Sequence, residues 1–236
     1  IGDKIKNIVE RLQAEPLAFD ESKLIDPLKV QGNVLLPPQR PPQQQPNQNG
    51  QNNQQPSDTP SPVQNNKNPL KSAVRIRLKD NGGLSFATGS YIGDTKDGKE
   101  SIILTVSHLF RGISKNAVIE SDIFTQDNKE HYTVEGRLIG HDPEADVGIY
   151  AIPKQNAEKL KPFKLASQDF VPKREDNVFS IGCGGGEPPT TQNCKVTEIN
   201  RYQGPQNFET TGVALQGRGG GPLVYSKTGQ IIGVTS

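Results

Sequence analysis

The residues best suited to chemistry in this chain of 236 residues are a histidine, an aspartate and a glycine cluster, in that order. His108 ends the apolar run that begins at Leu104, and Asp146 begins a second apolar run. A neutral imidazole can take a proton from a hydroxyl and return it to a leaving amine, while a carboxylate on its other ring nitrogen fixes the tautomer. The sequence therefore predicts His108 as a general base and Asp146 as the acid that orients it.

The glycine cluster extends from Gly217 to Gly221 and is followed by Pro222. A tight glycine-rich turn can point successive backbone N–H groups at one spot, where they stabilise a developing oxyanion. We therefore predict that the amides of Gly217 and Gly219 form such a donor pair.

Four motifs carry a resemblance to a known family. Thr105–His108 resembles the Thr-Ala-Ala-His motif of trypsin-like serine peptidases, and Asp146–Ile149 resembles their Asp-Ile-Ala-Leu motif. Gly217–Leu223 is similar to Gly-Asp-Ser-Gly-Gly-Pro-Leu, and Ala87–Ile92 is similar to the Gly-Ser-Gly strand of bacterial members. The resemblance covers about residues 70–236 and implies an all-β fold of two antiparallel six-stranded barrels, with the catalytic groups in the cleft between them.

The sequence departs from this family at the nucleophile. Gly219 stands at the position of the serine, and the next serine, Ser226, is expected at the far end of the following strand. In subtilisin the loss of the nucleophile costs about 10⁶-fold in kcat. Arg218 replaces the usual Asp or Asn, which argues against activation by a newly cleaved amino terminus.

Three interpretations of the departure remain open at this stage. The chain is a catalytically silent peptidase homologue that keeps peptide binding, or it is an active endopeptidase in which Gly219 is an engineered or erroneous residue. The third alternative is an all-β interaction module whose motifs are coincidental. The resemblance implies an extended peptide as ligand, paired with the edge strand at Val234, Thr235 and Ser236. It also implies a further strand and a helix after Ser236, so the second barrel is expected to be truncated.

The other titratable residues have weaker contexts. We predict that His131, His141, Asp142 and Glu144 are surface or turn residues, with Asp142 as the spare candidate for the orienting acid.

The two cysteines, Cys183 and Cys194, could pair as a disulfide or remain free thiols. They fall short of a zinc set, so we predict no metal and no cofactor.

Composition excludes several functions. Lys and Arg total 27 against 26 for Asp and Glu, which provides no basic excess for nucleic acid or for a membrane surface. No apolar run approaches the roughly 18 residues of a transmembrane helix. The family's bacterial members imply an extracytoplasmic location.

The elements that would position these residues are short strands. Apolar alternation between turns predicts strands at 73–79, 86–93, 101–108, 131–140, 146–153, 177–183, 194–202, 209–215, 221–226 and 230–236. Before them, residues 1–36 contain a short amphipathic helix and a connecting segment by the spacing of their apolar residues. Residues 37–69 are rich in Pro, Gln and Asn and predict a disordered linker, and residues 70–236 form the peptidase-like domain.

Overall fold

The structure, a computed structural model, describes residues 68–236 except 126, 157–158 and 168. The helix predicted within 1–36 and the linker predicted for 37–69, apart from its last two residues, lie outside the described residues. The first described element is a 3-10 turn, η2 (Pro69–Ser72), which leads directly into the first strand.

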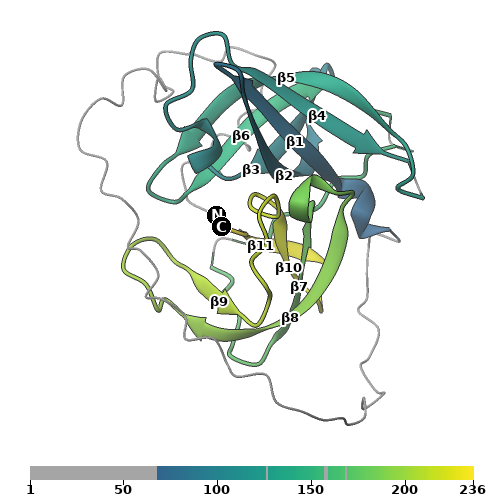
Figure 1. Cartoon of the computed structure of the whole chain (residues 1–236). Coiled ribbons are helices and arrows are strands. Elements are labelled where there is room, and N and C mark those ends of the chain that lie inside the picture. Colours follow the sequence, from purple (N-terminus) through teal and green to yellow (C-terminus); the bar gives the residue numbers. More distant parts are fainter. Residues whose placement is uncertain (1–67, 126, 157–158, 168) are drawn as a thin grey trace, which may run out of the picture.

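The first six strands form a closed antiparallel barrel in the order β1-β2-β3-β6-β5-β4, drawn blue to green in Figure 1. They are β1 (Ala73–Asp80), β2 (Gly83–Asp94), β3 (Glu100–Thr105), β4 (Val118–Phe124), β5 (His131–Asp142) and β6 (Val147–Pro153). The β1–β2 hairpin turns at Asn81 and Gly82, both with positive φ, as a two-residue turn requires. The barrel predicted from the sequence is therefore confirmed.

The remaining strands form a second, curled sheet in the order β11-β10-β7-β8-β9. They are β7 (Asn177–Gly182), β8 (Thr190–Ile199), β9 (Phe208–Thr210), β10 (Pro222–Tyr225) and β11 (Gln230–Val234). Among the described residues this sheet does not close. The strand predicted for 209–215 is wrong beyond Thr210, because the chain there enters the turns of the glycine cluster.

The most apolar strands, β3 and β6, lie where the two units pack together. In β3, Ile103 faces the inside of the barrel, while Ile102 and Leu104 pack against residues of the second sheet such as Phe179 and Ile181. Burial on both faces explains why these strands are continuous apolar runs rather than alternating ones. His108 follows the end of β3, and Asp146 directly precedes the start of β6. These two strands therefore position both residues of the candidate site.

A buried carboxylate joins three strands of the barrel. Asp122 on β4 is 0% exposed and accepts hydrogen bonds from Arg75 (2.8 Å), Arg77 (2.8 Å) and Thr133 (2.6 Å). Arg75 also donates to the carbonyl of Gly186 in the 3-10 turn η4 (Gly184–Gly186) of the second sheet. Asp122 therefore holds the arginine that links the two units.

The free energy of unfolding at low pH should depend on the protonation of Asp122. Burial alone would raise the pKa of Asp122, but its hydrogen bonds to Thr133, Arg77 and Arg75 hold it below its usual value. A lowered folded-state pKa gives stability that is present above the unfolded value near pH 4 and is lost as pH falls through the folded pKa. We expect the free energy of unfolding, measured in urea, to drop below about pH 4, and to drop less in Asp122→Asn.

The two cysteines are free and buried, which decides between the alternatives left open by the sequence. Cys194 pairs in register with Val178, whereas Cys183 follows Gly182 at the far end of the same strand. A strand advances about 3.3 Å per residue, so the two cysteines are separated by roughly 16 Å along the sheet, well beyond the reach of a disulfide.

Neither thiol should react in the folded protein. Burial raises the pKa of Cys183 to about 12 and also raises the pKa of Cys194, which removes the reactive thiolate. We expect Ellman's reagent to titrate no thiol in native buffer and two in guanidinium chloride. A fast reaction with native protein would contradict the burial of these side chains.

Among the described residues, the structure contains no helix with the length and apolar character needed to cross a membrane.

Candidate active site

His108 and Asp146 are in direct contact. Nδ1 of His108 lies 2.9 Å from Oδ2 and 3.1 Å from Oδ1 of Asp146, and the backbone N–H of His108 donates to Oδ1 at 2.9 Å. His108 lies in the 3-10 turn η3 (His108–Phe110), because β3 ends at Thr105 rather than at the histidine as predicted. One carboxylate therefore fixes both the ring and the backbone of the histidine, while the ring remains about half exposed.

Asp146 is the last residue of the turn before β6 and has a φ of 52°. Aspartate tolerates this left-handed conformation better than most residues. The hydroxyl of Ser236 donates to Oδ2 of Asp146 at 2.7 Å. Burial would raise the pKa of Asp146, but the hydrogen bonds from His108 and Ser236 lower it overall, so the carboxylate stays ionised.

Removing the hydroxyl of Ser236 should raise the pKa of Asp146, because a hydrogen bond to the charged form favours that form. We expect Ser236→Ala to shift the acid titration of the Asp146 carboxyl carbon, followed by ¹³C NMR, to higher pH. Ser226 follows β10 and its hydroxyl makes no hydrogen bond with Asp146, so Ser226→Ala is the matched control. An unchanged titration in Ser236→Ala would contradict the assignment of this hydrogen bond.

The backbone of the glycine cluster leaves two amides free. The N–H of Arg218 donates to the carbonyl of Leu215 at 3.1 Å, and Gly217 has a φ of 90°, the geometry of a type II turn. The carbonyl of Gln216 accepts from the N–H of Gly185 at 2.7 Å. A trans peptide places its N–H opposite its carbonyl, so the N–H of Gly217 points away from Gly185. Within residues 211–221, which the structure describes fully, neither Gly217 N–H nor Gly219 N–H donates a hydrogen bond.

Three glycines of the cluster are required by packing, and Gly219 is not. A Cβ on Gly217 would lie 2.5 Å from the carbonyl oxygen of Cys183, and those on Gly220 and Gly221 would lie even closer to backbone oxygens. A Cβ on Gly219 would meet nothing within 4 Å, and its φ lies outside the left-handed region. A side chain therefore fits at residue 219 without any change in the loop.

Thr88 on β2 ties this loop to the barrel, and it is completely buried. Its N–H donates to the carbonyl of Gly219 at 2.8 Å and its hydroxyl donates to the carbonyl of Gly217 at 2.7 Å. Its hydroxyl also accepts from the N–H of Cys183, and its carbonyl accepts from Thr105, three residues before His108. Thr88 lies within the motif Ala87–Ile92, but its role is not evident from the sequence, because it depends on hydrogen bonds to distant segments.

Arg218 is the buried anchor of the loop, with 7% of its surface exposed. Its guanidinium donates to Ser180, to the carbonyl of Gly182 and to both oxygens of Thr190. No carboxylate of the described residues pairs with it, and burial lowers its pKa. Arg218 thus fixes the backbone between the two free amides through neutral acceptors on β7 and β8.

The three residues predicted to bind an extended peptide differ in what they can offer. The N–H and carbonyl of Thr235 are already bonded to Gly221 and Gly220, at 2.9 and 2.8 Å. Successive residues of an extended strand alternate in direction, so the main-chain groups of Val234 and Ser236 face away from this loop. The C-terminus lies between the barrel and the second sheet, as Figure 1 shows.

Two predictions for the other titratable residues need correction. His141 is buried, not a surface or turn residue, since β5 carries it inward and its Nδ1 lies 2.7 Å from the hydroxyl of Ser107. Burial lowers its pKa. Asp142 is also buried. Its carboxylate accepts hydrogen bonds from the backbone N–H groups of Glu144 and Ala145 and stabilises the turn before Asp146. His131 and Glu144 are exposed as predicted.

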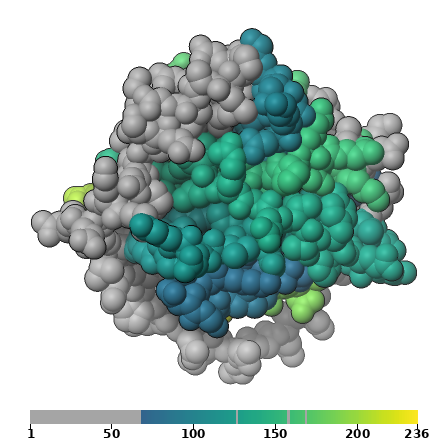
Figure 2. Space-filling view, turned by 90° about the horizontal axis from the view of Figure 1, so that it is seen from above, coloured from purple at the N-terminus to yellow at the C-terminus, as the bar shows by residue number. Residues whose placement is uncertain are grey.

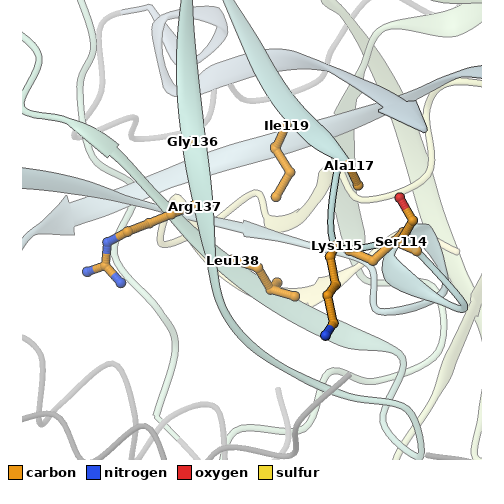
Figure 3. Close-up of a pocket in the computed structure, with 8 residues that line it drawn as sticks. Ser114, Lys115, Ala117, Ile119, Gly136, Arg137 and Leu138 are labelled. Atoms are coloured by element: carbon orange, nitrogen blue, oxygen red, sulfur yellow. The ribbon is translucent and has the colours of Figure 1, made fainter. Parts of the chain in front are cut away.

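A pocket of about 320 Å³ lies elsewhere, on the barrel (Figure 3). Its lining contains none of the candidate site residues, and Figure 3 shows the charged ends of Lys115 and Arg137 directed apart. It is lined by Ile113, Ser114, Lys115, Ala117, Ile119, Gly136, Arg137 and Leu138.

In the space-filling view of Figure 2, residues of the barrel, blue to green, form most of the coloured surface. In the part of the chain that the structure describes, no group of three or more His, Cys, Asp or Glu residues is arranged to hold a metal ion.

Residues 87–234 match the profile of the trypsin-like peptidase domain. The chain belongs to this family. The match begins one residue before Thr88 and includes His108, Asp146 and the glycine cluster. The comparison with curated protein sequences gives no match.

Solved structures share the fold of this trypsin-like domain. Deg5 has a TM-score of 0.56 at 22% identity, over 72% of this chain and 80% of that chain. The serine endoprotease from Yersinia pestis has a TM-score of 0.52 at 20% identity, over 71% of this chain and 54% of that chain. The inactive form of a serine-to-alanine mutant of Rv3671c from M. tuberculosis H37Rv has a TM-score of 0.53 at 24% identity, over 75% of this chain and 86% of that chain. The chain thus spans about half the length of the Yersinia pestis endoprotease.

Proposed function

We propose that this protein is a serine-endopeptidase homologue that binds extended peptides between its barrel and its second sheet without cleaving them through an acyl-enzyme. The observation that carries the proposal is the contrast at residue 219. The His108–Asp146 pair is linked to the glycine loop through Ser236 and Thr235, and the loop has two free amides beside a position where a Cβ fits but none is present. Without a hydroxyl at that position, no covalent intermediate can form.

Peptide binding follows from the groups that remain. Two unpartnered amides can accept a ligand carbonyl, and the outward main-chain groups of Val234 and Ser236 can add a peptide strand by β-augmentation. This proposal retains the family-based expectation of an extracytoplasmic location.

The direct test is a titration of the unmodified chain with acetylated octapeptides of varied sequence, each made as a C-terminal acid and as an amide. We expect saturable binding to a subset of these peptides, weakened when alternate peptide nitrogens are methylated, because methylation removes strand hydrogen bonds. Mass spectrometry should find every peptide intact, and a fluorophosphonate probe should leave residue 219 unlabelled. Absence of saturable binding, or cleavage with a covalent intermediate, would overturn the proposal.

A second candidate function is favoured by the open space at Gly219. An active endopeptidase with serine at this position would need no rearrangement of the loop. Sequencing the gene decides whether Gly219 is the encoded residue, and a serine codon there would replace the binding proposal with peptide-bond hydrolysis.

A further inference from the structure

We propose that the peptides bound at this site end there, with their C-terminal carboxylate held by Gly217, Gly219 and His108. The inference rests on the proposed function and specifies the ligand of the same site. It assigns to the site the chemistry of a carboxylate receptor rather than that of a reaction centre.

The first argument is the pair of free amides. The N–H groups of Gly217 and Gly219 donate to no acceptor within the loop, and the Gly185 to Gln216 bond fixes the direction of the first. Hydrogen bonds to an ionised acceptor are roughly twice as strong as those to a neutral one. A carboxylate oxygen therefore satisfies these two amides better than the neutral carbonyl of an internal peptide bond.

The second argument is the space above Gly219. A carboxylate has a second oxygen, for which an internal peptide carbonyl has no counterpart. Because a Cβ on Gly219 would meet nothing within 4 Å, there is room beside the amides. In a peptidase the serine side chain projects into this room, whereas in this chain the second carboxylate oxygen can enter it.

The third argument is charge. Nδ1 of His108 is committed to the carboxylate of Asp146, which leaves Nε2 for a ligand on the exposed part of the ring. Asp146 is the only charged group of the described residues that pairs with this imidazole. For Nε2 to donate while Nδ1–H also donates, the ring must carry both protons. If the free ring carries only its Nδ1 proton, binding of a carboxylate takes up one proton from solvent, and the imidazolium then lies between two carboxylates.

The fourth argument is the direction of the chain. The outward main-chain groups of Val234 and Ser236 lie next to Thr235, which is itself bonded to Gly220 and Gly221. A peptide paired with this edge is led directly to the amides of the glycine cluster. The residues before its terminal carboxylate can therefore pair as a strand while the carboxylate occupies the free amides.

The experiment compares three forms of the tightest octapeptide from the titration above: the C-terminal acid, the C-terminal amide, and the same sequence extended by two residues. Calorimetry in two buffers of different ionisation enthalpy measures both Kd and proton uptake. We expect the acid to bind at least about tenfold more tightly than the other two, with uptake of about one proton for the acid alone. Equal affinities for the three forms would overturn the inference and leave the proposed function standing, while no binding by any form would overturn both.

Two variants separate the contributions. Gly219→Ala adds a methyl group in the open space and should reduce the advantage of the acid over the amide. His108→Gln cannot become a cation and should abolish the proton uptake and most of that advantage. Circular dichroism and thermal melting check that both variants fold. An advantage of the acid that persists undiminished in both variants would refute the carboxylate site.

Discussion

Replacing Gly219 by serine should convert the protein into an esterase. The new Cβ enters open space, and the loop keeps two free amides. We predict that His108, held by Asp146, then acts as the base for the added hydroxyl. Loss of the nucleophile costs about 10⁶-fold in kcat in subtilisin, and its restoration should recover a large part of such a factor. The measurement is hydrolysis of p-nitrophenyl esters, with a burst that titrates one acyl group per protein molecule.

Two variants control this experiment. Gly219→Ala supplies the same Cβ without the hydroxyl and should stay at the background rate. Gly219→Ser combined with His108→Ala retains the hydroxyl without its base and should lose the burst. Absence of any burst in a folded Gly219→Ser protein would show that the imidazole and residue 219 are not within reach of one another.

Replacing Asp122 by asparagine should cost about 3 kcal/mol of the free energy of unfolding, the lower end of the range for breaking a buried ion pair. The substitution preserves shape but removes the only fully buried charge of the cluster. Arg75 and Arg77 are 15% and 24% exposed, so water partly compensates them, which sets the estimate at the lower end. Urea unfolding, extrapolated to zero denaturant, measures the loss.

The matched control is the neighbouring exposed pair between Lys79 and Glu120, at 2.6 Å. Lys79→Gln removes an interaction across the same two strands but at the surface, where such pairs contribute less than about 1 kcal/mol. Hydrogen exchange adds a second readout. Because Arg75 binds Gly186 next to the Gly185 amide, Asp122→Asn should speed exchange of that amide while Lys79→Gln should not. Equal losses in both variants would contradict the role of Asp122.

The features predicted well from sequence are those encoded locally. His108 and Asp146 each follow or begin a strongly apolar strand, and β3 and β6 are apolar because both of their faces are buried. The assignment of Gly219 to the nucleophile position rests on the glycines and proline in register around it, and it stays a prediction. Periodicity and short motifs suffice for such features.

What sequence could not supply depends on contacts between distant segments. Thr88 joins β2 to residues more than a hundred positions away, and no local pattern distinguishes it from any other strand threonine. The strand β4 was missed because it buries Ser121 and Asp122, which disrupt its apolar alternation. The state of the two cysteines depends on strand register, and the burial of His141 depends on a barrel that closes around it.

The open space at Gly219 separates the chemistry of this protein from its folding. Since no atom of the described residues packs against that position, glycine, alanine or serine can occupy it while the barrel and the glycine loop keep the same contacts. Replacing glycine by a residue that fits its backbone even adds about 0.4–1 kcal/mol by restricting the unfolded chain. Gain or loss of a hydroxyl at this position should therefore not destabilise the fold. On the proposed function, a single substitution would then change such a scaffold from a receptor into a hydrolase.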